Sequence, residues 1–273
     1  MKIAVLGASG SFGSDVADLL EADGHIVVRA SRRTGVDVVA GRGLLQALAS
    51  VDVVVDALHI NTFGARKSVP FFTRAASQTV KAAREQGVGR IVCLSIAGAV
   101  DPRVNGGFGY YKGKAAQESV YQQAGIPSTT VRSTQWFDFI PATTGLVARG
   151  PVALVPTLLM APARREEVAR FVAEVATAHR EARHEILAVR GPEVDTMANF
   201  ARRILAAGGD LAGRTPSVLK EAPLLGRAIA HGGLIPQDAF VTSQRFDEWL
   251  QTCLLYTSPS PRDATLSRMP SSA

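Results

Sequence analysis

The sequence predicts an α/β fold in which helices cover both faces of a doubly wound parallel sheet. Short apolar runs alternate with segments of helical periodicity, and glycines end several of those segments. Hydrophobic residues make up 47% of the chain and aromatic residues 6%, a mixture that suits close packing of helices on a sheet. Alternation of this kind is typical of parallel strands joined by helices. At 273 residues, the chain can form one such domain and a small additional lobe.

The first two elements are the most clearly marked. Residues 2–6 form an apolar run that ends at Gly7, as expected of a buried parallel strand. Residues 11–22 carry apolar side chains at helical spacing, and Gly24 follows as a helix stop. The same criteria predict strands over residues 25–30, 36–39, 51–57, 89–95 and 128–132, and helices over residues 43–49, 67–86 and 110–124.

The alternation loosens after about residue 135, where Pro and Gly become frequent. Helices are expected over residues 164–179 and 196–207, with a strand over residues 184–189 between them. We therefore expect a core over residues 1–134 and a smaller C-terminal α+β lobe over residues 135–252. The lobe should pack on the core and cover the reactive end of any cofactor that the core binds.

A glycine-rich loop connects the first strand to the first helix. Its glycines have the spacing G-x-x-G-x-x-G, and its place between a strand and a helix is the context that a Rossmann-type nucleotide site requires. Free N–H groups at the start of the helix would then face a pyrophosphate. The alternative is a loop that only turns a corner. The residues expected to bind the cofactor here are Gly7, Ser9, Gly10, Ser11, Phe12 and Gly13.

The residues that follow the second strand indicate which cofactor binds. An NAD site needs an Asp or Glu there, to accept hydrogen bonds from the ribose 2′-hydroxyl. This chain instead has Ser31, Arg32 and Arg33. Because a guanidinium can bind a 2′-phosphate, we expect Ser31 and Arg32 to select NADP(H) over NAD(H). Alternatively, the two arginines are solvated surface charges.

A Y-x-x-x-K pair opens the helix expected over residues 110–124. Tyr110 and Lys114 are four residues apart and share one helix face. A tyrosine has a reference pKa of about 10, and the nearby Lys114 ammonium would adapt it to acid–base catalysis. The same ammonium could also hold the nicotinamide ribose of the cofactor. Ser95, at the carboxyl end of a strand, could hydrogen-bond a substrate carbonyl. In the alternative, Tyr110 packs on the sheet edge and Lys114 only holds a ribose, and Tyr111 leaves open which tyrosine faces the nicotinamide. His59 follows another strand and could approach the cofactor, but a solvent-facing loop position is the expected one.

These motifs together resemble the short-chain dehydrogenase/reductase superfamily. The glycine spacing and the segment VRSTQWFDF at residues 131–139 resemble its atypical, NmrA-like NAD(P)H-binding branch. The resemblance implies NADP(H), a catalytic role for Ser95, Tyr110 and Lys114, and contacts from Asp37 to the adenine and from Ala57 to the ribose. It implies an oxidoreductase that moves a hydride to or from a small carbonyl, quinone or similar apolar substrate. A non-catalytic, redox-sensing NADP(H) regulator and a sugar-nucleotide epimerase or dehydratase are the alternatives.

Composition also argues against other classes of protein and of partner. The formal net charge is +6, but no Lys/Arg run reaches five residues, so nucleic acid is not an expected partner. The two cysteines lie in no metal-binding pattern, and no metal is expected. Because no signal peptide or membrane span is visible, we expect a cytoplasmic protein, either a monomer or a homodimer, that acts on a small molecule.

The last 21 residues differ from the rest of the chain. They read CLLYTSPSPRDATLSRMPSSA, are rich in Ser and Pro, and show neither helical nor strand periodicity. Two parts of this segment resemble a translated sequencing-library adapter. We therefore expect residues 253–273 to be a non-native, disordered tail without a part in the fold.

Overall fold

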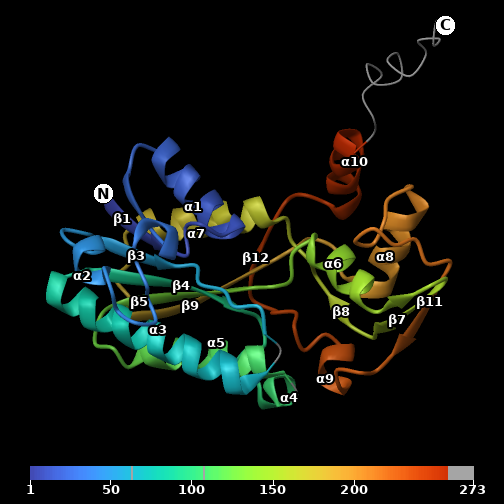
Figure 1. Ribbon diagram of the computed structural model, residues 1–273, viewed down its shortest axis with the longest axis horizontal. Helices are drawn as coiled ribbons and strands as arrows, with labels where there is room; N and C mark the ends of the chain where they lie inside the picture. Colours follow the sequence, from blue (N-terminus) through green and yellow to red (C-terminus); the bar gives the residue numbers. More distant parts are fainter. Residues whose placement is uncertain (63, 107, 258–273) are drawn as a thin grey trace, which may run out of the picture.

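The computed structural model describes residues 1–62, 64–106 and 108–257, and a parallel sheet of seven strands forms its centre (Figure 1). The strand order is β2-β1-β3-β4-β5-β9-β12, and every neighbouring pair is parallel. This confirms the predicted doubly wound fold. The strands are β1 (Lys2–Leu6), β2 (Ile26–Ala30), β3 (Val53–Asp56), β4 (Arg90–Ile96), β5 (Ser128–Ser133), β9 (His184–Arg190) and β12 (Phe240–Val241).

Helices cover both faces of this sheet, as Figure 1 shows. Side chains of β1 alternate between the two faces: Ile3 and Val5 pack with α1 and α7, whereas Ala4 and Leu6 pack with the helices on the opposite side. All four are fully buried, as expected for a strand inside a three-layer fold. The helices of the core are α1 (Ser11–Ala22), α2 (Leu44–Ala47), α3 (Ala65–Gln86), α4 (Pro102–Asn105), α5 (Gly109–Gln122) and α7 (Arg165–Thr177).

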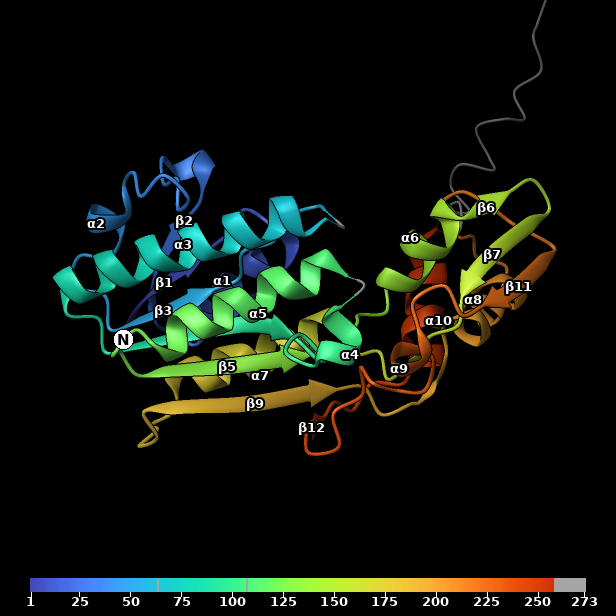
Figure 2. The ribbon, with the colours of Figure 1, turned by 90° about the horizontal axis from the view of Figure 1, so that it is seen from below.

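The lobe lies beyond the carboxyl ends of the strands (Figure 2). Its core is aromatic: the ring of Phe246 packs on Phe200 with centroids 4.8 Å apart and on Phe137 at 5.2 Å. A three-stranded sheet and a two-stranded sheet complete it. Its elements are α6 (Phe139–Leu146), β6 (Ala148–Arg149), β7 (Val152–Pro156), β8 (Leu159–Met160), β10 (Asp195–Thr196), α8 (Met197–Ala206), β11 (Val218–Ala222), α9 (Arg227–Ala230) and α10 (Phe246–Thr257).

Three details differ from the sequence prediction. Residues 36–39 form no strand but a turn, because the Asp37 carboxylate accepts hydrogen bonds from the backbone N–H groups of Val39 and Ala40 at 3.1 Å each. The chain also returns to the core after residue 134, since α7, β9 and β12 belong to the central layers. Finally, α10 continues to Thr257, where a disordered tail is expected from residue 253. Residues 258–273 lie outside the described part of the chain.

A helix that crosses a membrane needs about 20 consecutive, mainly apolar residues. Within the described ranges, no helix is both long enough and apolar enough to cross a bilayer.

Candidate functional site

The glycine-rich loop begins with two glycines that the fold requires. Gly7 adopts φ +82°, and a Cβ there would lie 3.0 Å from the carbonyl oxygen of Ala57. At Gly13, a Cβ would lie 2.4 Å from the carbonyl oxygen of Gly7, too close for any side chain. Both glycines therefore allow α1 and the end of β3 to approach the loop closely.

Gly10 has a different role in the same loop. A Cβ at Gly10 would meet only the Gly7 carbonyl, at 3.4 Å, so the backbone itself does not require glycine there. Gly10 is the N-cap of α1, and no side chain caps this helix end. The exposed loop thus presents uncapped amides at a helix N-terminus, an arrangement that fits a phosphate group.

The other predicted loop residues share this surface. Ser9 and Ser11 are exposed at its rim. The ring of Phe12 is 5% exposed and stacks on Trp136 with centroids 4.9 Å apart. Phe12 can therefore contribute its backbone N–H to a ligand, while its side chain joins the loop to the segment after β5.

The segment after β2 holds the predicted selector residues. Ser31 is buried, and its backbone N–H donates to the Thr34 hydroxyl at 2.9 Å, which shapes the short 3-10 helix Arg32–Thr34. Arg32 and Arg33 are exposed and form no ion pair with any described residue. The nearby Arg29, in contrast, pairs with Asp18 and Glu21 on α1. Arg32 and Arg33 are thus the guanidinium groups at this strand end that are available to an anion.

Asp37 and Ala57 are the remaining residues predicted to contact the cofactor. The Asp37 carboxylate holds the turn of residues 37–40, and hydrogen bonds from those backbone amides keep its pKa below the ordinary value. Ala57 is buried, and its N–H donates to the Leu6 carbonyl at 3.1 Å. Its backbone therefore borders the crevice between β1 and β3, where the strand order reverses. Ligands of doubly wound sheets bind at such a position.

Lys114 is enclosed rather than free. Its ammonium donates to the carbonyls of Leu58 at 3.1 Å and Leu94 at 3.0 Å, and to Gln117 Oε1 at 3.0 Å. It also lies 4.4 Å from the centroid of the Phe72 ring. Burial lowers the pKa of Lys114. All three N–H donors of the ammonium are thus hydrogen-bonded to these three acceptors. The ammonium therefore joins the ends of β3 and β4 to α5.

Gln117 continues this network to a buried acid. Its Nε2 donates to Asp56 Oδ2 at 2.6 Å, and the Tyr121 hydroxyl donates to the same oxygen at 2.5 Å. Asp56 Oδ1 accepts from the Leu58 N–H at 2.9 Å. The carboxylate is fully buried and fully hydrogen-bonded, and it has a structural role beneath the site.

Ser95 faces a second buried acid. Its hydroxyl donates to Glu118 Oε1 at 2.5 Å, and Arg132 forms an ion pair with Glu118 Oε2 at 2.7 Å. Glu118 lies two helical turns along α5 from Tyr110, a rise of about 12 Å. No hydrogen bond joins any two of Ser95, Tyr110 and Lys114, all of which are described residues. The structure therefore links none of these side chains to another by a hydrogen bond, although Tyr110 and Lys114 both lie against the ring of Phe72.

The hydrogen-bond partner of Tyr110 lies outside α5. Its hydroxyl lies 3.0 Å from Nδ1 of His59, and the two ring centroids are 5.4 Å apart. Tyr110 is half-buried, and burial is the main cause that raises its pKa. Tyr111 is buried, contacts Phe108 and accepts a hydrogen bond from Gln135 Nε2 at 3.3 Å. Of the two tyrosines, Tyr110 is the one accessible at the carboxyl edge of the sheet.

His59 is a residue of the site that the sequence predicts as a solvent-facing loop residue. It is exposed, as expected, but it also contacts Tyr110. Its place three residues after β3 is the sequence feature that points to a functional role, because that strand ends at the ligand-binding edge of the sheet.

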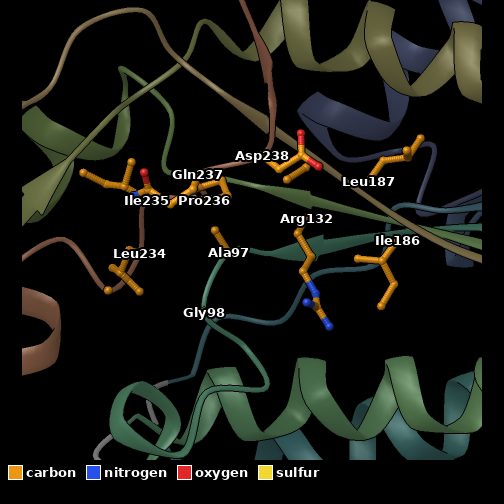
Figure 3. A pocket seen from close by; sticks show the side chains of 12 residues that line it. Ala97, Gly98, Arg132, Ile186, Leu187, Leu234, Ile235, Pro236, Gln237 and Asp238 are labelled. Carbon is orange, nitrogen blue, oxygen red and sulfur yellow. The ribbon is translucent and has the colours of Figure 1, made fainter.

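A hollow of about 250 Å³ lies on the α5 side of the sheet (Figure 3). Figure 3 shows Arg132 extending from the sheet into it, while Asp238 points the opposite way. None of its lining residues is a predicted site residue. They are Ala97, Gly98, Arg132, Ile186, Leu187, Ala188 and residues 233–238. Among the described side chains, no cluster of three or more His, Cys, Asp or Glu could hold a metal ion.

Comparisons with known proteins agree with the predicted nucleotide-binding fold. The family described as NAD(P)H-binding matches residues 7–179, a range that includes the glycine-rich loop, Arg32 and Tyr110. No curated protein sequence matches the chain.

Solved structures share the fold. A nucleoside-diphosphate-sugar epimerase from Staphylococcus aureus is 18% identical, covers 92% of this chain and 100% of its own, and has a TM-score of 0.67. The NADPH complex of an NADPH-dependent quinone oxidoreductase from Escherichia coli is 16% identical, with 92% and 99% covered and a TM-score of 0.66. A UDP-N-acetylglucosamine 4-epimerase from Bacillus cereus is 15% identical, with 94% and 96% covered and a TM-score of 0.67.

Proposed function

Because the chain belongs to the NAD(P)H-binding family, we propose that it is an NADP(H)-dependent oxidoreductase whose proton-transfer residue is Tyr110. The family match confirms the resemblance predicted from the glycine loop. The residues of that loop would hold the pyrophosphate, and Arg32 the 2′-phosphate. When bound, the cofactor would supply or accept a hydride. The protein residues would bind the cofactor, orient the substrate and move the proton.

The observation that carries this proposal is the accessible Tyr110 hydroxyl beside His59. Because burial raises the pKa of Tyr110, its phenol remains protonated at neutral pH. A protonated phenol suits donation to a carbonyl oxygen, so reduction is the favoured direction. Leu58, Ile60 and Phe108 are half-buried and lie near His59 and Tyr110 along the chain. These apolar side chains support a small carbonyl or quinone as the substrate.

Substitution of Arg32 tests the choice of cofactor. We expect Arg32→Ala to weaken NADPH binding about tenfold, because an exposed guanidinium would lose its contact with the 2′-phosphate. NADH affinity should stay within about twofold, since NADH lacks that phosphate. Titration of both nucleotides by isothermal calorimetry measures this difference. Arg33→Ala is the matched control, and equal losses of NADPH and NADH affinity in Arg32→Ala would contradict the assignment.

One observation favours the alternative of a non-catalytic NADP(H)-binding regulator. Ser95 donates to Glu118, and Lys114 uses its donors on Leu58, Leu94 and Gln117, so neither side chain assists Tyr110. Such a regulator needs the glycine loop and Arg32 but not the Tyr110 hydroxyl. The likeness to epimerases shows the fold alone and does not favour sugar-nucleotide chemistry.

Steady-state oxidation of NADPH against a panel of aldehydes, ketones and quinones separates the two functions. An oxidoreductase should consume NADPH with at least one substrate class, faster than with NADH at equal concentration. A protein that binds NADPH tightly and turns over no member of the panel would contradict the enzymatic proposal and support the regulator.

A further inference from the structure

A short chain of hydrogen bonds runs from Tyr110 to the surface. The Tyr110 hydroxyl lies 3.0 Å from His59 Nδ1, and His59 Nε2 lies 2.7 Å from Asn61 Oδ1. Tyr110 is in the first turn of α5, whereas His59 and Asn61 follow β3. The two segments are far apart in sequence, so the fold itself creates this contact.

The chemistry of the partners sets the direction of these bonds. An amide oxygen only accepts hydrogen bonds, so Nε2 of His59 carries a proton and donates it to Asn61. In the neutral ring, Nδ1 is then unprotonated and accepts from the Tyr110 hydroxyl. Asn61 thereby fixes the tautomer that faces Tyr110.

Among the described side chains near Tyr110, Lys114 is not free to supply a proton. Lys114 is 3% exposed, and its ammonium gives all three of its donors to Leu58, Leu94 and Gln117. A phenol that donates its proton leaves a phenolate, and burial makes that anion unfavourable. His59 contacts Tyr110 on one side and is exposed to water on the other. It is placed to return the proton.

We propose that His59 relays protons between solvent and Tyr110, with Asn61 orienting the imidazole. The inference rests on the proposed oxidoreductase function. NADPH, when bound, would supply the hydride to the carbonyl carbon and would leave as NADP⁺. The Tyr110 hydroxyl would give its proton to the carbonyl oxygen, and the product would be an alcohol. Solvent then protonates Nδ1 of the neutral His59 ring. The imidazolium that forms gives this Nδ1 proton to the phenolate oxygen and becomes neutral again, which restores the starting state.

Kinetics of two His59 variants test the relay. We expect His59→Ala and His59→Gln each to lower kcat about 10- to 50-fold, while KM and NADPH affinity stay within about twofold. Glutamine can hydrogen-bond Tyr110 but cannot pass a proton at neutral pH, so it separates relay from positioning. Added imidazole should raise kcat several-fold in His59→Ala and leave the double variant with Tyr110→Phe unchanged. His179→Ala, which removes an exposed histidine after α7, is the matched control.

Nuclear magnetic resonance of the imidazole nitrogens provides a readout without turnover. The chain has five histidines, so ¹⁵N-histidine labelling and the His59→Gln variant assign the His59 signal. It should show the tautomer protonated at Nε2, and its Nδ1 shift should change in Tyr110→Phe.

The outcomes distinguish the relay from the function on which it rests. Full activity in His59→Gln, or an Nδ1 shift that Tyr110→Phe leaves unchanged, overturns the relay while an active wild-type protein upholds the oxidoreductase. A wild-type protein that binds NADPH but reduces nothing overturns both, even if the tyrosine–histidine hydrogen bond is observed.

Discussion

Tyr110→Phe is expected to lower kcat for NADPH-dependent reduction by about 10²- to 10⁴-fold, the usual contribution of a general acid. The substitution removes one oxygen from a half-buried ring. The ring would keep its edge-on contact with Phe72, whose centroid lies 5.6 Å away. We therefore expect the melting temperature and NADPH affinity to change little. Single-turnover rates with the best substrate, measured beside the binding constant, separate chemistry from binding.

Tyr111→Phe is the matched control for this loss. It removes the hydroxyl oxygen from the next residue in the chain. That buried hydroxyl accepts a hydrogen bond from Gln135. Its rate should stay within about threefold of the wild-type rate. If Tyr111→Phe loses the activity and Tyr110→Phe keeps it, Tyr111 is the proton donor and the assignment to Tyr110 is wrong.

Gly13→Ala is expected to destabilise the protein by about 3 kcal/mol and to weaken nucleotide binding at least about 100-fold. The new methyl group would lie 2.4 Å from the Gly7 carbonyl oxygen and 3.1 Å from the Ala8 Cα. Both contacts are with backbone, which cannot rotate away as a side chain can. Relief requires α1 to move away from β1, and that movement displaces the amides that would face the phosphates. Urea denaturation and NADPH titration measure the two effects.

Gly10→Ala separates binding from stability in the same loop. Its methyl group would meet the Gly7 carbonyl at 3.4 Å, so unfolding free energy should change by less than about 1 kcal/mol. NADPH affinity should still fall, because the methyl group occupies the approach to the helix N-terminus. Gly64→Ala, at the N-cap of α3 with open space around it, controls for substitution at a helix start. Unchanged NADPH binding in both loop variants would place the phosphates elsewhere.

The first βαβ unit could be predicted from sequence almost to the residue. β1 and α1 have the predicted bounds because local signals agree there: an apolar run, a glycine turn and helical periodicity up to Gly24. α3 ends at Gly87, which adopts φ +68°, for the same reason. These signals are short-range, and a single sequence contains them.

The predictions that failed depended on a side-chain hydrogen bond within a turn or on contacts between distant segments. An apolar pattern at residues 36–39 resembles a strand, yet the Asp37 carboxylate binds the local backbone instead. No local signal says that β9 joins β5 in the central sheet rather than a separate lobe. The hydrogen-bond partners of the predicted catalytic residues also depend on distant segments. The partners that bind Ser95 and Lys114, Glu118 and the Leu94 carbonyl, are visible only when α5 is packed on the sheet.

The three acceptors of the Lys114 ammonium have a consequence for how this protein can be dissected by mutation. Removal of the side chain would take away the ammonium that donates to the carbonyls of Leu58 and Leu94, and each hydrogen bond from a charged group contributes about 1.5–3 kcal/mol. An inactive Lys114→Ala protein is therefore expected whether the chain is an enzyme or only a nucleotide-binding scaffold. The informative substitutions are those at the water-accessible end of the site, which change a reacting atom and leave the joined strand ends intact.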